Sequence, residues 1–432
     1  MADKSDNLSS FMEKGWLTLD NAAKLFPAII SEDLTSVFRI TASLNEPVNY
    51  RSLREAVSIT SARFPYFNVS LGSGLFWHFL EFNKNLPHIQ VEGNVPCTAF
   101  ALKRKNEPLY RIIAKENRIS VEFIHILTDG GGALEYLKSL LYTYLVASGK
   151  DPGSPGDIIL PSMPVSEEEF EDGYKRFFRK LPPPLKLPKA WHLPFLLNER
   201  PRLRITRAIV SVDQMLELAR THKVSITEYF VAVYLFSLQK IFLETAGKHK
   251  SRKKVLRIEL PVNMRKKCSS RTMRNFSLFV LPELDMRLGT YTFDEVVHSV
   301  HHQLQFSSDV KQISRFLSQN VGYEKLFFIR MLPLFIKKLA IASIYRGFAS
   351  KRFTGLVTNL GVISIPPVME TFIDSFEIIP PPPNLKVKLG CAMVTFKGSL
   401  RITFLNLTGS PDVERLILRH FIDAGVHVRV QN

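Results

Sequence analysis

The chain has 432 residues, of which 45% are apolar and 22% are charged, a composition that is typical of folded globular proteins and argues against a disordered one. This length is too great for one ordinary core, so two domains or two large halves are expected. Lysine and arginine total 57 against 40 aspartate and glutamate, a net charge of +17. Such a surplus favours anionic partners, namely nucleic acid, an acidic membrane surface or a phosphorylated ligand.

The cysteines are few and isolated. Cys97, Cys268 and Cys391 form no C-x-x-C pair, which argues against a structural zinc site and a disulfide framework and suits a reducing compartment. The polar start of the chain shows no secretory signal, and no run of about 18 uninterrupted apolar residues is present. We therefore expect a cytoplasmic protein without a membrane-spanning helix, with association at a membrane surface as an open alternative.

The first half of the chain mixes strand-like and helix-like stretches. A strand over 37–44 precedes a helix over 51–64, and two hairpins follow over 68–82 and 109–125. The first hairpin is expected to turn at Gly72-Ser73-Gly74 and the second near Glu116-Asn117. Apolar positions alternate along the last of these strands, so its more apolar face carries Ile119, Val121, Phe123 and His125.

Residues 151–200 are rich in proline and are expected to form a crossover between two halves. The second half repeats the order of elements, and Ser225 with Glu228 predicts a capping box ahead of an apolar helix. Helices are expected from residue 292 to about 350. The expected strands are 202–212, 255–265, 275–284, 353–361 and a hairpin over 386–407 that turns at Lys397-Gly398; a helix over 412–425 closes the chain.

The sharpest chemical signal is His125-Ile126-Leu127-Thr128-Asp129-Gly130, at a turn from a strand into an apolar helix. A histidine with a pKa near 6.5 accepts a proton at neutral pH, and a well-placed base accelerates a reaction by about 10²–10⁴. An aspartate four residues later can orient the ring or hold the loop. Spacing alone also allows a plain polar residue at a strand end, an ordinary N-cap and glycines that only permit the turn.

This H-x-x-x-D-G turn resembles the active-site motif of the CoA-dependent acyltransferase superfamily. That family includes chloramphenicol acetyltransferases, non-ribosomal peptide condensation domains, plant alcohol acyltransferases, and bacterial and fungal alcohol acetyltransferases. Residues 62–67 and 74–82 are most similar to the alcohol acetyltransferase branch. Many relatives carry a second histidine where this chain has Ile124. Three further segments follow the family's order: Pro261-Val262-Asn263-Met264-Arg265, Arg274-Asn275-Phe276 and Val357-Thr358-Asn359-Leu360-Gly361.

The resemblance implies an α/β (α+β) fold of two chloramphenicol-acetyltransferase-like subdomains, residues 1–150 and 201–432, joined by the linker 151–200 and forming a V around a central tunnel. It implies that His125 is the general base and that Asp129 is structural, paired with an arginine for which Arg265 is the candidate; a solvated strand-end charge is the alternative. Gly130 would let the backbone approach the pantetheine arm. The oxyanion donors would be Asn275, Thr358 and Asn359, for which ordinary strand-end or turn hydrogen bonds are the alternative.

The implied reaction moves an acyl group from acyl-CoA to an alcohol or glycolipid hydroxyl, or to an amine, with no tightly bound cofactor and no metal. One alternative is a condensation-type enzyme that uses carrier-protein thioesters. Another is a non-catalytic relative that binds an anionic lipid surface.

Two basic segments remain open to interpretation. Lys250, Arg252, Lys253 and Lys254 belong to the densest basic run, which can hold the phosphates of CoA or form a solvated loop. No nucleic-acid motif accompanies the charge, so no nucleic-acid partner is expected. Residues 326–352 mix large apolar and basic side chains; they suit either contact with an anionic membrane or a buried helix pair with basic outer faces.

Overall fold

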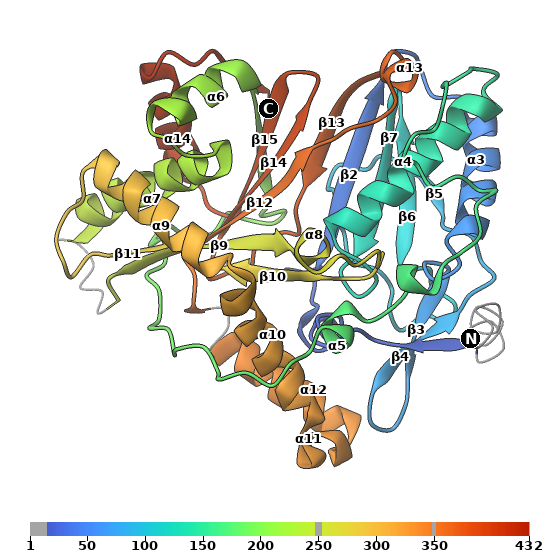
Figure 1. The fold of residues 1–432 in the computed structure, drawn as a ribbon, viewed down its shortest axis with the longest axis horizontal. Helices are drawn as coiled ribbons and strands as arrows, with labels where there is room; N and C mark the ends of the chain where they lie inside the picture. Colours follow the sequence, from blue (N-terminus) through green and yellow to red (C-terminus); the bar gives the residue numbers. More distant parts are fainter. Residues whose placement is uncertain (1–14, 247–252, 348–350, 432) are drawn as a thin grey trace.

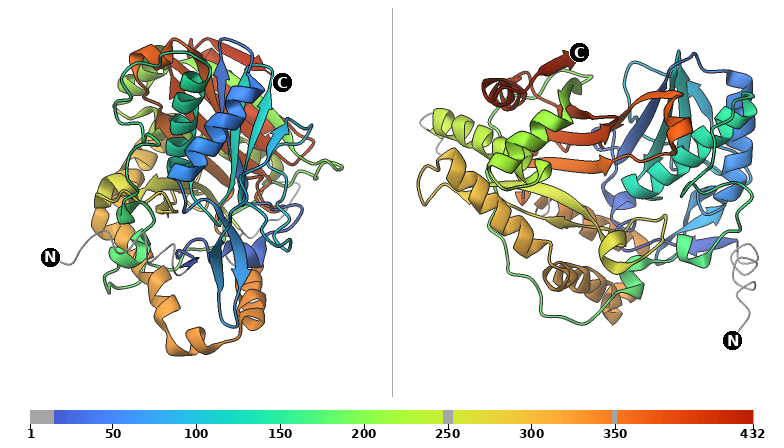
Figure 2. Two further views of the ribbon diagram at one scale, coloured as in Figure 1. Left: turned by 90° about the vertical axis from the view of Figure 1, so that its right-hand side faces the viewer. Right: turned by 45° about the horizontal axis from the view of Figure 1, so that its top comes forward.

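The computed structural model describes residues 15–246, 253–347 and 351–431. Two α/β halves lie side by side, each with a sheet whose outer face is covered by helices (Figure 1). The helices of the first half stand at one end of the molecule and those of the second half at the other, as the tilted view also shows (Figure 2).

The first sheet has five strands in the order β13-β2-β7-β6-β5. Its outer face is covered by α3 (Tyr50–Arg63) and α4 (Gly130–Ala147). The predicted alternation along the last hairpin is present, because its apolar face is buried in the first core. The strands are β2 (Val37–Leu44), β5 (Ile89–Val91), β6 (Tyr110–Lys115), β7 (Arg118–Ile124) and β13 (Ile373–Ile379).

One strand of this sheet comes from the far end of the chain. β13 pairs antiparallel with β2, with Phe376 opposite Ala42. It belongs by sequence to residues 201–432, which were expected to form the second subdomain alone. A division at residue 200 therefore does not separate the strands of the two sheets, because β13 lies after residue 200 but pairs with β2 in the first sheet.

The second sheet has eight strands in the order β10-β9-β12-β14-β15-β8-β16, with β11 paired to β9. They are β8 (Arg204–Ser211), β9 (Val255–Asn263), β10 (Ser277–Val280), β11 (Glu283–Asp285), β12 (Gly355–Val362), β14 (Leu389–Phe396), β15 (Ser399–Asn406) and β16 (Val428–Gln431). The outer helices are α6 (Val212–Thr221), α7 (Ile226–Ala246), α9 (Phe293–Ser307) and α14 (Asp412–Asp423).

The predicted capping box before α7 is confirmed. The Ser225 N–H donates to Glu228 Oε2 over 2.7 Å, and the Glu228 N–H donates to Ser225 Oγ over 3.2 Å. Among the described residues, α7 is the one helix long and apolar enough to cross a membrane, but most of that stretch is buried within the second core, as in the central helix of many globular proteins.

The two cores meet across the second sheet. Successive side chains of a strand point to opposite faces, so Val357 of β12 and Met393 of β14 enter the core under the outer helices. Leu360, Ala392 and Val394 lie on the other face and pack into or against the first core. The inner face of the second sheet thus rests on the first half.

A third group of elements lies below both sheets (Figure 1). The expected first hairpin forms, but its turn lies at residues 74–77 rather than at 72–74, and the Gly74 N–H donates to the Trp77 carbonyl over 3.0 Å. The elements of this group are β1 (Trp16–Thr18), β3 (Val69–Ser73), β4 (His78–Phe82), α2 (Phe26–Ile29), α10 (Val310–Lys325), α11 (Phe327–Met331) and α12 (Leu334–Gly347).

The proline-rich segment between the halves carries only short helices, η1 (Glu167–Glu169) and α5 (Gly173–Arg176). It is anchored by Glu169, whose buried carboxylate accepts bonds from both terminal nitrogens of Arg63, over 2.9 and 2.8 Å, and from the Tyr66 hydroxyl over 2.6 Å. The remaining short helices are α8 (Met264–Cys268) and α13 (Pro367–Glu370).

Candidate active site

His125 is the first residue beyond β7, and both halves of the molecule hold its backbone. Its N–H donates to the Ser36 carbonyl over 2.9 Å, within the first half. Its carbonyl accepts from the side-chain amide of Asn275 over 2.9 Å, and Asn275 belongs to the second half. The position of the imidazole therefore depends on how the two halves meet.

The tautomer of the His125 ring follows from its hydrogen bond. Nδ1 lies 3.1 Å from the Thr128 carbonyl oxygen. A carbonyl oxygen only accepts, so Nδ1 carries the proton and Nε2 keeps its lone pair. The residue is only half-buried, and the nearby Asn275 side chain favours the protonated form of the ring. Nε2 is thus the nitrogen that can accept a proton from an incoming molecule.

Aromatic rings orient this imidazole. The Phe26 ring of α2 stacks on it at 5.4 Å between centroids with an interplanar angle of 15°, and the Phe38 ring of β2 lies at 4.6 Å. Burial lowers the pKa of His125 below its ordinary value, against the opposing effect of the Asp129 carboxylate. The unprotonated, basic form therefore prevails at neutral pH.

Asp129 is the N-cap of α4 and joins the two halves. Its carboxylate accepts from the Gly131 N–H over 3.1 Å, from the Phe276 N–H over 2.9 Å, and from both terminal nitrogens of Arg265 over 3.0 and 2.8 Å. The expected pair with Arg265 is present. Burial raises the pKa of Asp129, but the guanidinium and these hydrogen bonds outweigh it, and the pKa lies below its ordinary value. Asp129 thus stays ionised and holds the loop.

The glycines after Asp129 allow the halves to approach closely. A Cβ on Gly132 would lie 2.1 Å from the Met273 carbonyl oxygen and 2.3 Å from Thr128 Oγ1. A Cβ on Gly130 would meet only the end of the Leu360 side chain, at 3.1 Å. Gly132 is therefore the position at which any side chain would overlap its neighbours, and sequence reasoning did not single it out. The role expected for Gly130 stays a prediction.

Asn275 does not suit its expected role as an oxyanion donor. Both protons of its side-chain amide are used, one on the His125 carbonyl and one on Asp20 Oδ2 over 3.1 Å. Asn275 and Asp20 are both buried. Burial raises the pKa of Asp20 to about 6, against the effect of Arg274. Asn275 therefore positions the loop that carries His125. Sequence reasoning missed Asp20, whose only local signal is an aspartate ahead of a short helical turn.

Thr358 and Asn359 lie on β12 and face opposite ways. Asn359 donates to the Thr227 hydroxyl over 2.8 Å and accepts from the Gly361 N–H over 2.8 Å, so it serves the outer side of the sheet. Thr358 shares the inner face with Leu360, whose side chain would contact a Cβ placed on Gly130. Of the three expected oxyanion donors, Thr358 is the one that is directed toward the half that carries His125 and whose side chain makes no hydrogen bond among the described residues.

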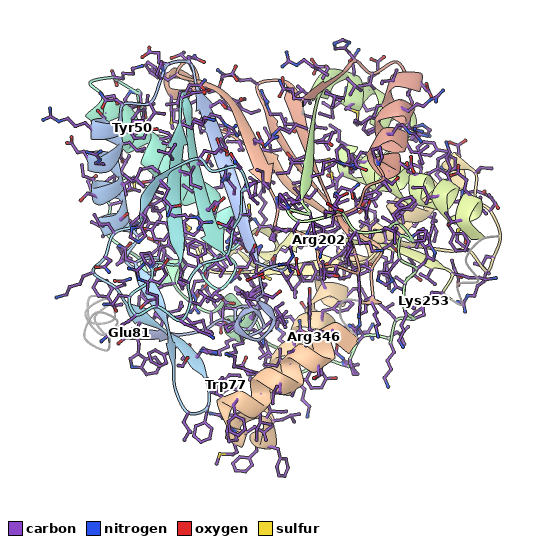
Figure 3. The ribbon with its side chains drawn as sticks, turned by 180° about the vertical axis from the view of Figure 1, so that it is seen from behind. Tyr50, Trp77, Glu81, Arg202, Lys253 and Arg346 are labelled. Carbon is purple, nitrogen blue, oxygen red and sulfur yellow. The ribbon has the colours of Figure 1, made fainter. Side chains whose placement is uncertain are left out.

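The described part of the basic run lies far from this site. Lys253 and Lys254 precede β9, whereas Arg265 follows it, and the nine residues of β9 span roughly 26 Å. Lys253 lies at the outer edge of the second half (Figure 3). Lys250 and Arg252 lie outside the described residues. The structure therefore does not bring Lys253 and Lys254 together with the imidazole.

Two depressions can be described, and neither is lined by His125. One lies on α6, and the other lies between α2, the hairpin loop and α12, where it is lined by Lys24, Trp77 and Lys337 among others. The expected tunnel to the imidazole stays a prediction. No group of three or more histidine, cysteine, aspartate or glutamate side chains within residues 15–246, 253–347 and 351–431 is placed to hold a metal ion.

Comparison with solved structures shows that the chain has the two-subdomain, chloramphenicol-acetyltransferase-like fold of condensation domains and an O-acetyltransferase over nearly its whole length. The fold class expected from the sequence is confirmed. No protein-family model matches the chain, and no curated protein matches it in sequence.

Three solved structures illustrate the likeness. Polyketide synthase associated protein 5 from Mycobacterium tuberculosis is 14% identical with a TM-score of 0.60, over 94% of this chain and 97% of that one. TRI3 trichothecene 15-O-acetyltransferase from Fusarium sporotrichioides is 9% identical with a TM-score of 0.58, over 94% of both chains. The first condensation domain of the CDA synthetase is 13% identical with a TM-score of 0.57, over 93% and 94%. Identities of this size establish the fold rather than the substrates.

Proposed function

We propose that this protein is an acyltransferase that moves an acyl group from acyl-CoA to the hydroxyl of an alcohol or glycolipid, with His125 as the general base. The observation that carries the proposal is the hydrogen bond from His125 Nδ1 to the Thr128 carbonyl, which leaves the lone pair on Nε2. The two-subdomain fold, which it shares with an O-acetyltransferase, supports the same reaction.

In the proposed reaction, Nε2 takes the proton of the acceptor hydroxyl as its oxygen attacks the thioester carbonyl. The tetrahedral intermediate then collapses, the carbon–sulfur bond breaks, and the proton passes from the imidazolium to the CoA sulfur. The products are an ester and free CoA. No nucleophilic serine or cysteine is required, because the base activates the acceptor directly.

Negative charge develops on the thioester oxygen during the attack, and a preorganised donor there lowers the barrier. The Thr358 hydroxyl is the candidate donor, since it lies on the inner face of β12 with no side-chain hydrogen bond among the described residues. The two phenylalanine rings beside the imidazole favour an acceptor molecule that is apolar around its hydroxyl. A hydroxyl on an apolar molecule thus suits the site better than a strongly charged acceptor.

The test measures free-thiol release from acyl-CoAs in the presence of pooled alcohols and amines. His125→Ala should lower the rate by about 10²–10⁴ without a change in the circular dichroism spectrum. His302→Ala, at an exposed position on α9, is the matched control and should retain full activity. Full activity of the His125 variant would refute the mechanism. Turnover only with a phosphopantetheinyl carrier protein as donor would refute free acyl-CoA as the substrate.

A further inference from the structure

Six large apolar side chains gather at the lower end of the molecule, and we call them the apolar tip. They come from the loop between β3 and β4 and from α11 and α12. Their exposed fractions run from 54% to 82%, and the residues are Leu75, Phe327, Phe328, Met331, Phe335 and Leu339. Figure 3 shows aromatic side chains that project beyond the helices below Trp77. A folded monomer rarely exposes so large an apolar cluster without a binding role.

The apolar tip is one rigid surface rather than two loose ones. The Leu334 N–H donates to the Leu75 carbonyl over 2.8 Å, which joins α12 to the hairpin loop. The ammonium of Lys337 donates to the carbonyls of Phe76 and Arg330 over 3.0 and 3.1 Å and lies 3.6 Å from the centre of the Trp77 ring. Both segments project together in two views (Figures 1 and 2).

The burial pattern of α12 is the reverse of that of an ordinary surface helix. Lys337 is its one buried residue, whereas Phe335 and Leu339 are exposed. α11 has no buried residue at all. The buried helix pair that the sequence allowed is therefore not formed: Leu334 and Ile341 line the depression against α2, whereas the apolar side chains of the apolar tip face outward.

The charges around the apolar tip indicate which kind of partner it binds. Residues 326–347 contain no aspartate or glutamate, and Arg330 and Lys338 are exposed beside the apolar side chains. Apolar residues that project from a basic surface are the arrangement that inserts into the headgroup region of an anionic bilayer. We propose that the apolar tip and these two cations form a docking surface for an anionic lipid bilayer.

This surface lies next to the proposed catalytic centre. α12 packs against α2, and Phe26 of α2 stacks on the His125 ring. An enzyme docked in this way would bring α12, which packs against the helix that holds the His125 ring, to the lipid surface. The docking itself does not depend on acyl transfer, so each property can fail without the other.

The test is co-sedimentation of the full chain with vesicles. Vesicles of phosphatidylcholine with roughly 30% phosphatidylglycerol should bind it about tenfold more tightly than phosphatidylcholine alone. Phe328→Asp with Phe335→Asp should weaken binding by at least about tenfold. Lys338→Glu should reduce the preference for anionic vesicles. Leu288→Asp, which replaces an isolated leucine that is 81% exposed, is the control and should bind as the unchanged chain does.

The outcomes that overturn the proposal are distinct. The proposal fails if the unchanged protein stays in the supernatant with anionic vesicles. It also fails if the variant with Phe328→Asp and Phe335→Asp binds these vesicles as tightly as the unchanged protein. A stable dimer in solution that the double variant dissolves, with no vesicle binding, would assign the apolar tip to a second copy of the chain. Thermal unfolding of each variant shows that any loss of binding is not a loss of fold.

Discussion

Replacing Asp129 with alanine should lower the free energy of unfolding by about 3–5 kcal/mol, because a part-buried charge loses its partner. The carboxylate accepts from both terminal nitrogens of Arg265 and from the Phe276 N–H, so one substitution leaves a guanidinium without its counter-ion and a buried amide unsatisfied. It also removes the N-cap of α4, worth about 1 kcal/mol. Arg265→Ala should cost a similar amount, since it leaves the carboxylate unpaired.

The double variant should cost less than the sum of the single ones, with a coupling energy of about 2–3 kcal/mol. The assay is urea unfolding followed by circular dichroism at pH 7. Glu135 and Lys138, 3.1 Å apart on the surface of α4, are the control pair and should couple by less than about 1 kcal/mol. Additive costs at Asp129 and Arg265 would refute the structural role assigned to this pair.

The same pair predicts a pH dependence. The pKa of Asp129 is lowered on folding, chiefly because the Arg265 guanidinium outweighs burial. Its contribution is therefore fully present above the ordinary pKa of an aspartate, about 3.9, and is lost as pH falls through the lower pKa of the folded state. The Arg265→Ala variant should lose less stability on acidification than the unchanged protein, and an equal loss would contradict this account.

Three further predictions concern Gly132, Glu259 on β9 and Phe26. Gly132→Ala should destabilise the protein by several kcal/mol, roughly the range of severe steric substitutions, because its Cβ would overlap the Met273 carbonyl; an unchanged melting temperature would contradict the close packing. Burial raises the pKa of Glu259 to about 8, so stability should fall as pH rises from about 4.5 to 8, and Glu259→Gln should stabilise the protein at pH 8 by roughly 2–3 kcal/mol. Urea unfolding at pH 4.5 and pH 8 measures this difference, and a Glu259→Gln variant no more stable than the unchanged protein at pH 8 would exclude the Glu259 carboxyl as the cause of the loss of stability. Phe26→Ala should admit water to the His125 ring and move the acidic limb of kcat/KM toward pH 6.5, and a pH–rate profile with an unmoved limb would argue against that effect of burial.

Local signals in the sequence were sufficient where neighbours in the chain determine the structure. The capping box at Ser225 and Glu228, the turn at Lys397 and the alternation before His125 depend on residues within a few positions of one another. The link between Asp129 and Arg265 crosses 136 positions, and spacing alone did not predict it. It was expected only through the resemblance of the two segments to one family.

Other features depend on contacts that no local pattern encodes. Asn275 satisfies both of its amide protons on Asp20 and His125, partners 255 and 150 positions away, so its role could not be separated from that of an oxyanion donor. The sequence of residues 326–352 shows apolar and basic side chains together, but it does not show which of them face the rest of the protein. The structure settles it, because Lys337 is turned inward to bind two carbonyls of the third group of elements.

The placement of β13 has a consequence for how the molecule is made. The edge of β2 stays uncovered until residue 379 has left the ribosome, since the strand that caps it is synthesised after most of the second sheet. A nascent chain that ends near residue 200 would expose this edge and the apolar side chains around it. Native assembly of the first half therefore waits for the second, and the two would acquire their final structure as one cooperative unit.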